Sequence, residues 1–126
     1  MIAVSNETIE VADLLGKLGK QGAGSVVLHI GVVKPDPDGR RSSGITFGAG
    51  GDLETELLEI ENSVRERFRL VDVVLARRLG RLGIGDVILF AAVSANDREN
   101  AFGACRALVE RCKKMKALEK EEHYED

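Results

Sequence analysis

Two apolar segments joined by a short, glycine-rich connection constrain the fold of this chain more than any other feature of its sequence. Residues 70–76 and 87–93 consist mainly of Val, Leu, Ile, Phe and Ala, a composition typical of buried strands. The connection over residues 80–86 is too short for the crossover that parallel neighbours require, so the two strands are predicted to pair antiparallel. An α+β fold is therefore favoured over a regular alternation of strands and helices.

The other predicted elements follow from apolar spacing and from capping signals. Asp52 is a good N-cap, and apolar residues recur at helical spacing from Leu53 to Phe68, which predicts a helix. Turn-rich residues 35–44 predict a mobile loop. We expect the helices to pack on one side of a mostly antiparallel sheet. The further predicted elements are helices over 11–20 and 99–116, the latter capped by Asn96 or Asp97, and strands over 2–5, 25–34 and 45–47.

Length and charge narrow the class of protein. Residues 1–126 are predicted to form one domain, because this length suffices for one hydrophobic core. The formal charge of −3 gives no general attraction to nucleic acid or to a membrane surface. No apolar run is long enough to span a bilayer, and the N-terminal residues lack the order of a signal peptide. A cytoplasmic location is expected.

The two cysteines, Cys105 and Cys112, are seven positions apart on a predicted helix. Two helical turns separate their Cα atoms by about 10 Å, which is too far for a disulfide. No nearby His or Cys completes a set of metal ligands, so two buried thiols are expected and no metal.

The histidines and glycine clusters give no strong motif. His29 lies inside an apolar strand and is interpreted as a core or sheet-face residue, and His123 lies in an acidic, solvated segment. The short glycine clusters at 22–24 and 48–51 lack the Lys-Ser/Thr that follows a phosphate-binding loop, so they are interpreted as turns. No local motif supports a Ser-His-Asp or Cys-His arrangement.

Basic residues recur where predicted elements end. Lys34 ends a predicted strand, and Arg98 opens a predicted helix. Lys113 lies near the end of that helix, and Lys120 lies beyond it. Such positions often hold anions, because free backbone N–H groups and the helix dipole add to side-chain charge. The alternative is that these are scattered, solvated members of the 18 Lys and Arg residues. The recurrence favours an anion-binding site.

Three motifs occur in a characteristic order, and together they resemble one family. The stretch 24–34 is similar to a strand that ends in Gly-x-Val-Arg, with Lys34 in place of the arginine. Residues 77–86 resemble His-Arg-x-Gly-x-Leu followed by Gly-Asp, and residues 94–102 resemble Ser-Ala-His-Arg followed by Ala-Phe. From Ala101 to Glu122 no gap is needed. This order is similar to that of the large, catalytic subunit of molybdopterin synthase.

The resemblance implies a fold, an activity and partners. The fold would be of the α/β hammerhead type, and the protein a homodimer within a heterotetramer. Each protomer would receive the C-terminal Gly-Gly tail of a small ubiquitin-like sulfur-carrier subunit. The thiocarboxylate on that tail would supply sulfur to cyclic pyranopterin monophosphate, forming molybdopterin for molybdenum cofactor biosynthesis. The chain would act as a sulfurtransferase, with no cofactor of its own.

The resemblance also implies site residues. Lys113 and Lys120 would be the catalytic amines, as proton donors or in transient covalent contact with the intermediate. The substrate-binding residues would be Lys34, Asp97, Arg98, Glu121 and Glu122, with Glu121 helping to position Lys120.

The sequence departs from the family pattern at several of these positions. Asn96 or Asp97 stands where the family has its substrate-site histidine, and Arg77 stands for a strand-end histidine. Ala117 and Glu119 replace the Pro and Trp of the lysine loop. A carboxylate beside a phosphate site would repel the ligand.

Two alternative interpretations stay open. One is a non-catalytic dimer of the same family that binds a sulfur-carrier partner. The other is an unrelated anion-binding domain.

Overall fold

The computed structural model describes residues 1–35 and 42–124 and places them in two sheets and three helices. Most of the loop predicted over 35–44 lies outside the described residues. Within the described ranges, no helix is long and apolar enough to cross a membrane. The strands are β1 (Ile2–Ser5), β2 (Ser25–Val32), β3 (Ser42–Ala49), β4 (Asp72–Arg78), β5 (Gly80–Leu82), β6 (Val87–Ala95) and β7 (Leu118–Tyr124). The helices are α1 (Val11–Lys17), α2 (Leu53–Arg67) and α3 (Arg98–Cys112).

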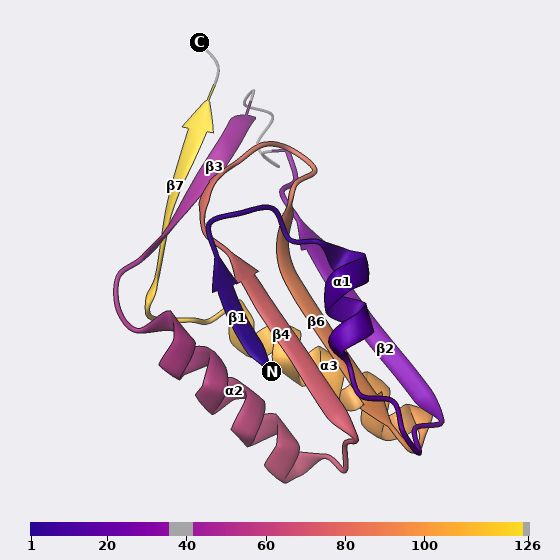
Figure 1. The fold of residues 1–126 in the computed structure, drawn as a ribbon. Helices are drawn as coiled ribbons and strands as arrows, with labels where there is room; N and C mark the ends of the chain where they lie inside the picture. The colour runs from indigo at the N-terminus through magenta and orange to yellow at the C-terminus, as the bar shows by residue number, and fades with distance from the viewer. Residues whose placement is uncertain (36–41, 125–126) are drawn as a thin grey trace.

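The larger sheet has the strand order β1-β4-β6-β2 and contains the predicted antiparallel pair. β4 and β6 run antiparallel, with Val73 opposite Val93 and Leu75 opposite Ala91. β2 pairs antiparallel with the other side of β6, whereas β1 pairs parallel with β4. The predicted α+β class with a mostly antiparallel sheet is therefore confirmed (Figure 1).

The smaller sheet has the order β5-β3-β7 and is entirely antiparallel. Its centre is the strand predicted around residues 45–47, which extends over Ser42–Ala49. Its two edge strands were missed. β5 lies in the predicted glycine-rich connection, and β7 has the polar sequence Leu-Glu-Lys-Glu-Glu-His-Tyr. Neither segment has strand propensity of its own, so pairing with β3 makes each one a strand.

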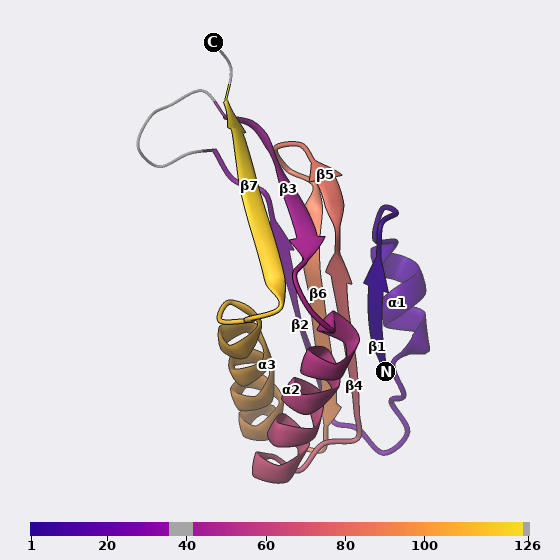
Figure 2. The same ribbon diagram turned by 90° about the vertical axis from the view of Figure 1, so that its left-hand side faces the viewer.

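The helices cover both faces of the larger sheet (Figure 2). α2 and α3 pack together on one face, as expected, over a core that includes Leu57, Leu75 and Leu108. The short α1 lies on the opposite face instead, where Leu14 and Leu15 pack against a second cluster around Phe90, so the expectation of helices on one side does not extend to α1. Helices thus cover both faces of the larger sheet, and this cover buries the central strands β4 and β6 on both sides.

Both long helices begin at an aspartate that was expected to cap them. The Asp52 carboxylate accepts a hydrogen bond from the Thr55 backbone N–H at 3.0 Å, and Asp97 accepts one from that of Asn100 at 2.9 Å. Between the two predicted caps of α3, the structure selects Asp97 and not Asn96. α3 ends at Cys112, four residues earlier than the predicted boundary at residue 116.

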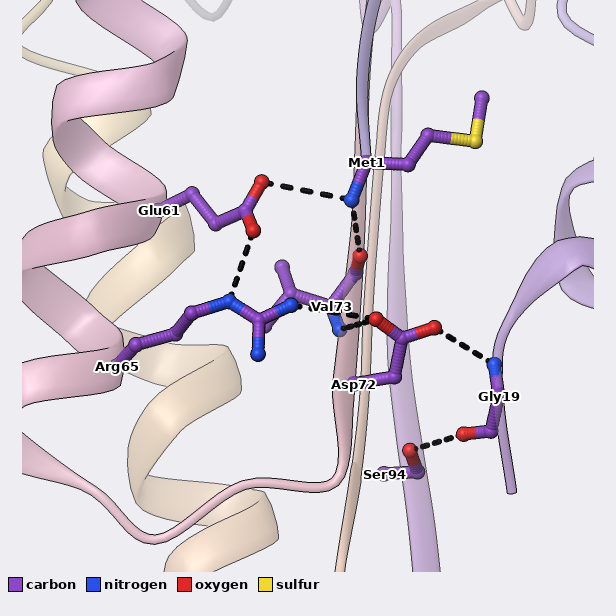
Figure 3. Close-up of polar contacts among 7 residues, drawn as sticks. All are labelled: Met1, Gly19, Glu61, Arg65, Asp72, Val73 and Ser94. Carbon is purple, nitrogen blue, oxygen red and sulfur yellow. Dashed lines mark hydrogen bonds and ion pairs between the residues drawn. The ribbon is translucent and has the colours of Figure 1, made fainter. Parts of the chain in front are cut away.

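A polar network joins α2 to the edge of the larger sheet (Figure 3). Glu61 is buried; one of its oxygens accepts a hydrogen bond from Arg65 Nε at 2.8 Å, and the other lies 3.4 Å from the Met1 ammonium. Arg65 Nη2 also donates to Asp72 at 3.2 Å, and Asp72 in turn accepts from the Gly19 backbone N–H at 2.7 Å. Glu61 is thus the acceptor on which two cations converge.

We predict that Glu61→Ala lowers the free energy of unfolding by about 2 kcal/mol, because it leaves two cations without their shared acceptor. The loss stays below that of a fully buried pair, since the Arg65 side chain is partly exposed. Urea unfolding followed by circular dichroism measures it. Glu66→Ala, an exposed glutamate of the same helix, is the matched control. Equal losses in the two variants would contradict a structural role for Glu61.

Candidate functional site

A cavity of about 580 Å³ lies where β2, β3, β7 and the end of α3 meet. Lys34, Lys113, Lys120 and Glu122 all line it, together with apolar residues such as Ile45 and Phe47. Four of the seven predicted site residues are thus brought to one place from three separate segments of the chain. Among the described residues that line the cavity, the amines of three lysines outnumber one carboxylate, which suits an anionic ligand.

The end of β2 places Lys34. The Val33 backbone N–H donates to the Asp86 carbonyl at 3.0 Å, and the Gly85 N–H donates to the Val33 carbonyl at 2.8 Å. These two bonds tie the residue before Lys34 to the loop between β5 and β6. Gly85 has a φ of +88°, a conformation that glycine adopts without strain. Lys34 is exposed and lines the cavity from this fixed position.

Strand alternation sorts the charged residues of β7. Lys120 lies opposite Phe47 and Glu122 lies opposite Ile45, so both share the cavity face of the smaller sheet. Their side chains form an ion pair of 3.1 Å, with 54% and 38% of their areas exposed, so solvent screens the attraction.

Glu121 lies on the other face of β7. It pairs with Thr46, whose hydroxyl hydrogen-bonds His123 Nε2 on the same side at 2.6 Å. Glu122, and not Glu121, therefore contacts Lys120.

The turn between α3 and β7 depends on a residue that sequence reasoning missed. The Glu56 carboxylate accepts hydrogen bonds from the backbone N–H groups of Lys116 and Ala117, at 2.8 and 2.9 Å. The Gly50 N–H donates to the Ala117 carbonyl at 2.7 Å. These bonds hold the chain against α2 and the end of β3, so that β7 starts in register beside β3. No local sequence signal marks Glu56, because its partners are 60 residues away.

Lys113 and the Asp97–Arg98 pair lie at opposite ends of α3. Lys113 caps the C-terminal end, where it borders the cavity, whereas Asp97 caps the N-terminal end. Sixteen residues of helix separate the two ends by about 24 Å. The hydrogen bond from the Asn100 backbone holds the pKa of Asp97 below its usual value. Neither Asp97 nor Arg98 lines the lysine cavity.

Arg77, near the end of β4, is buried. Its guanidinium lies 4.4 Å from the ring centroid of Phe47, and its Nε has no hydrogen-bond partner among the described residues. Burial lowers the pKa of Arg77 from its usual value. Because Phe47 lines the cavity, Arg77 supports the cavity wall from behind and does not line the cavity itself.

A second cavity, of about 700 Å³, runs between β2 and α3. Its lining combines apolar residues, among them Val27, Phe102 and Val109, with His29, Arg106, Glu110 and Lys113. His29 and Lys113 line both cavities, so the two adjoin at these residues. Phe102 is 62% exposed at its border, an unusual position for a large aromatic side chain.

Both cysteines are buried and free, as expected. Burial raises the pKa of Cys105 and of Cys112 to about 11 each. Thiols in this state are poor nucleophiles at neutral pH. Among the described residues, no group of three or more His, Cys, Asp or Glu side chains is arranged to hold a metal ion.

Known proteins are similar to this chain in sequence. A molybdopterin synthase catalytic subunit of Halalkalibacterium halodurans is 30% identical over 98% of this chain and 80% of its own length. One from Bacillus subtilis is 26% identical over 98% of this chain and 79% of its own length.

A solved structure also has a similar fold. A crystal structure of molybdopterin synthase from Staphylococcus aureus superposes with a TM-score of 0.90 at 25% identity, covering 98% of this chain and 90% of that one. The family model described as MoaE protein matches residues 4–115. By this match and by its likeness to these relatives, the chain belongs to the MoaE protein family.

Proposed function

We propose that this chain is the catalytic subunit of a molybdopterin synthase. It would transfer sulfur from a thiocarboxylated small carrier protein to cyclic pyranopterin monophosphate, as a sulfurtransferase of molybdenum cofactor biosynthesis. The observation that carries the proposal is the meeting of Lys34, Lys113 and Lys120 in one cavity, from three different elements. The names of the family relatives support the same activity.

The cavity has the charge that both reactants require. The precursor carries a phosphate and the carrier ends in a thiocarboxylate, so each brings an anion to the three lysines. Amines placed around a developing negative charge stabilise it without reorganising solvent, which is a large source of rate enhancement. In this proposal Lys34 holds the phosphate, while Lys113 and Lys120 act on the reacting groups, one of them as proton donor.

The assembly is part of the proposal. A small ubiquitin-like sulfur-carrier subunit would insert its C-terminal Gly-Gly tail towards the cavity, within a heterotetramer built on a homodimer of this chain. Arg98, and Asp97 beside it, would contact substrate only if the second copy of the chain supplies them, because α3 keeps them away from the cavity of their own protomer. The second cavity, which Phe102 lines with a largely exposed ring, is a surface suited to a protein neighbour.

The proposal also covers domain organisation, location and partners. Residues 1–126 would act as one domain in the cytoplasm. The chain would bind neither nucleic acid nor a membrane. It would carry no cofactor or metal of its own.

We predict that Lys120→Ala and Lys113→Ala each lower the rate of molybdopterin formation by at least about 100-fold, because each removes an amine from the reacting centre. The measurement is product formation in a reconstituted assay with the thiocarboxylated carrier and the cyclic precursor. Lys114→Ala is the matched control, since Lys114 is exposed, adjacent to Lys113, and outside the cavity lining.

Wild-type turnover by Lys120→Ala, with its fold intact by circular dichroism, would refute the catalytic assignment of that residue. No product from the wild-type chain would favour the alternative, a non-catalytic dimer that binds the carrier. Carrier binding measured by calorimetry then separates that alternative from an unrelated anion-binding domain.

The two glutamates of β7 provide a second test of the geometry. We predict that Glu122→Gln lowers kcat about two- to fivefold, the effect of removing an exposed ion pair that orients Lys120. Glu121→Gln, on the opposite face of β7, leaves kcat unchanged. Steady-state kinetics of both variants in the same assay measure this, and an equal or reversed effect would show that Glu122 does not position Lys120.

The proposed sulfur transfer does not pass through the cysteines of this chain. We predict that iodoacetamide at pH 8 leaves Cys105 and Cys112 unmodified in the folded protein, because burial raises their pKa values to about 11. Mass spectrometry of native and urea-unfolded samples measures the modification. Rapid labelling of either thiol in the native protein would contradict this and would reopen a thiol relay.

A further inference from the structure

His29 occupies the position where the two cavities meet. It lies in the middle of β2, opposite Ala91 of β6, whose small side chain leaves room above it. The exposed residues of β2 alternate with Val27, His29 and Gly31. Val27 packs against the core on the α3 side, so the alternation places His29 on that side too. His29 lines both cavities, as Lys113 does.

The imidazole of His29 points along β2 towards the lysines. A Cβ atom added to Gly31 would lie 3.4 Å from His29 Nε2, so the ring leans over Gly31, which itself lines the lysine cavity. A larger residue at 31 would crowd the ring. Among the described residues no side chain or backbone group hydrogen-bonds the His29 ring. A half-buried imidazole is therefore available to a ligand in this cavity.

We propose that His29 is a ligand-contacting residue of this site, which donates a hydrogen bond to the anionic group of the ligand beside Lys113. A ring N–H of this imidazole supplies a directional donor next to the ammonium of Lys113. The inference rests on the proposed function only in taking the lysine cavity as the ligand site.

The groups that face His29 define the charge it adds to. Around the lysine cavity these are Lys34 of the β2 end, Lys113 of the α3 end, and Lys120 with Glu122 of β7. Around the second cavity they are Arg106 and Glu110 of α3. The Arg106 and Glu110 charges offset each other, and Glu122 is engaged with Lys120. The imidazole N–H thus adds a donor to a cavity in which, among the described residues, lysines outnumber carboxylates.

Sulfate is the probe for this inference, because it is an anion without the pterin part of the substrate. We predict that His29→Phe, which keeps a ring but has no N–H donor, binds sulfate about tenfold more weakly than the wild type, the effect of one lost hydrogen bond to a charged group. His29→Arg keeps a donor at this position and binds sulfate at least as tightly as the wild type.

The second histidine gives a matched control. His123 hydrogen-bonds Thr46 on the face of β7 away from Lys120, so His123→Gln keeps the wild-type affinity for sulfate. Dissociation constants come from NMR titrations, in which the ring resonances of His29 are also followed. Melting curves of each variant establish that it is folded.

Two results would overturn the inference: sulfate binding by His29→Phe that is as tight as in the wild type, or His29 ring resonances that do not move with saturating sulfate. The proposed function fails separately, through the absence of product from the wild-type chain in the reconstituted assay. The sulfate result does not depend on that assay. If the inference and the proposed function both hold, His29→Phe also raises the KM for the cyclic precursor.

Discussion

The antiparallel pairing of β6 with both of its neighbours is the constraint on which the rest of the structure depends. β6 is buried on both faces, so α1 must cover one side and α2 with α3 the other. Its pairing with β2 places the end of β2 beside the loop that follows β5, and this sets Lys34. The continuation of β6 into α3 carries Lys113 back along the sheet to the same end. Two of the three lysines thus owe their positions to one strand.

The third lysine depends on a different kind of interaction. β7 has a charged sequence that does not form a strand alone, and the backbone of β3, the carboxylate of Glu56 and the Thr46–His123 hydrogen bond hold it in place. The alternation of β7 then decides that Lys120 and Glu122 face the cavity while Glu121 faces away. A slip of one residue would exchange these faces. The site is therefore sensitive to contacts that carry little hydrophobic stabilisation.

The proposed chemistry is consistent with how charge is distributed between core and cavity. Arg77 is buried against Phe47 behind the cavity wall, and both thiols are buried, so none of these groups lines the cavity that holds the three lysines. The groups left available at the cavity are amines, one carboxylate and the imidazole of His29. This inventory suits the binding and protonation of an anionic substrate, with sulfur supplied from a partner and not from the chain itself.

Much of this was readable from the sequence, because it depends on local pattern. Apolar periodicity predicted α2, the strands β4 and β6 and their antiparallel pairing, and side-chain chemistry predicted the caps Asp52 and Asp97. The order of basic residues identified Lys34, Lys113 and Lys120 as candidates. Only the tertiary structure decided which of these meet: it joined the three lysines, separated Arg98 from them by the length of α3, and turned His29 towards the cavity. The reason is physical, since β5, β7 and the Glu56 contact exist only through pairing between segments far apart in the chain, and no local propensity encodes such pairing.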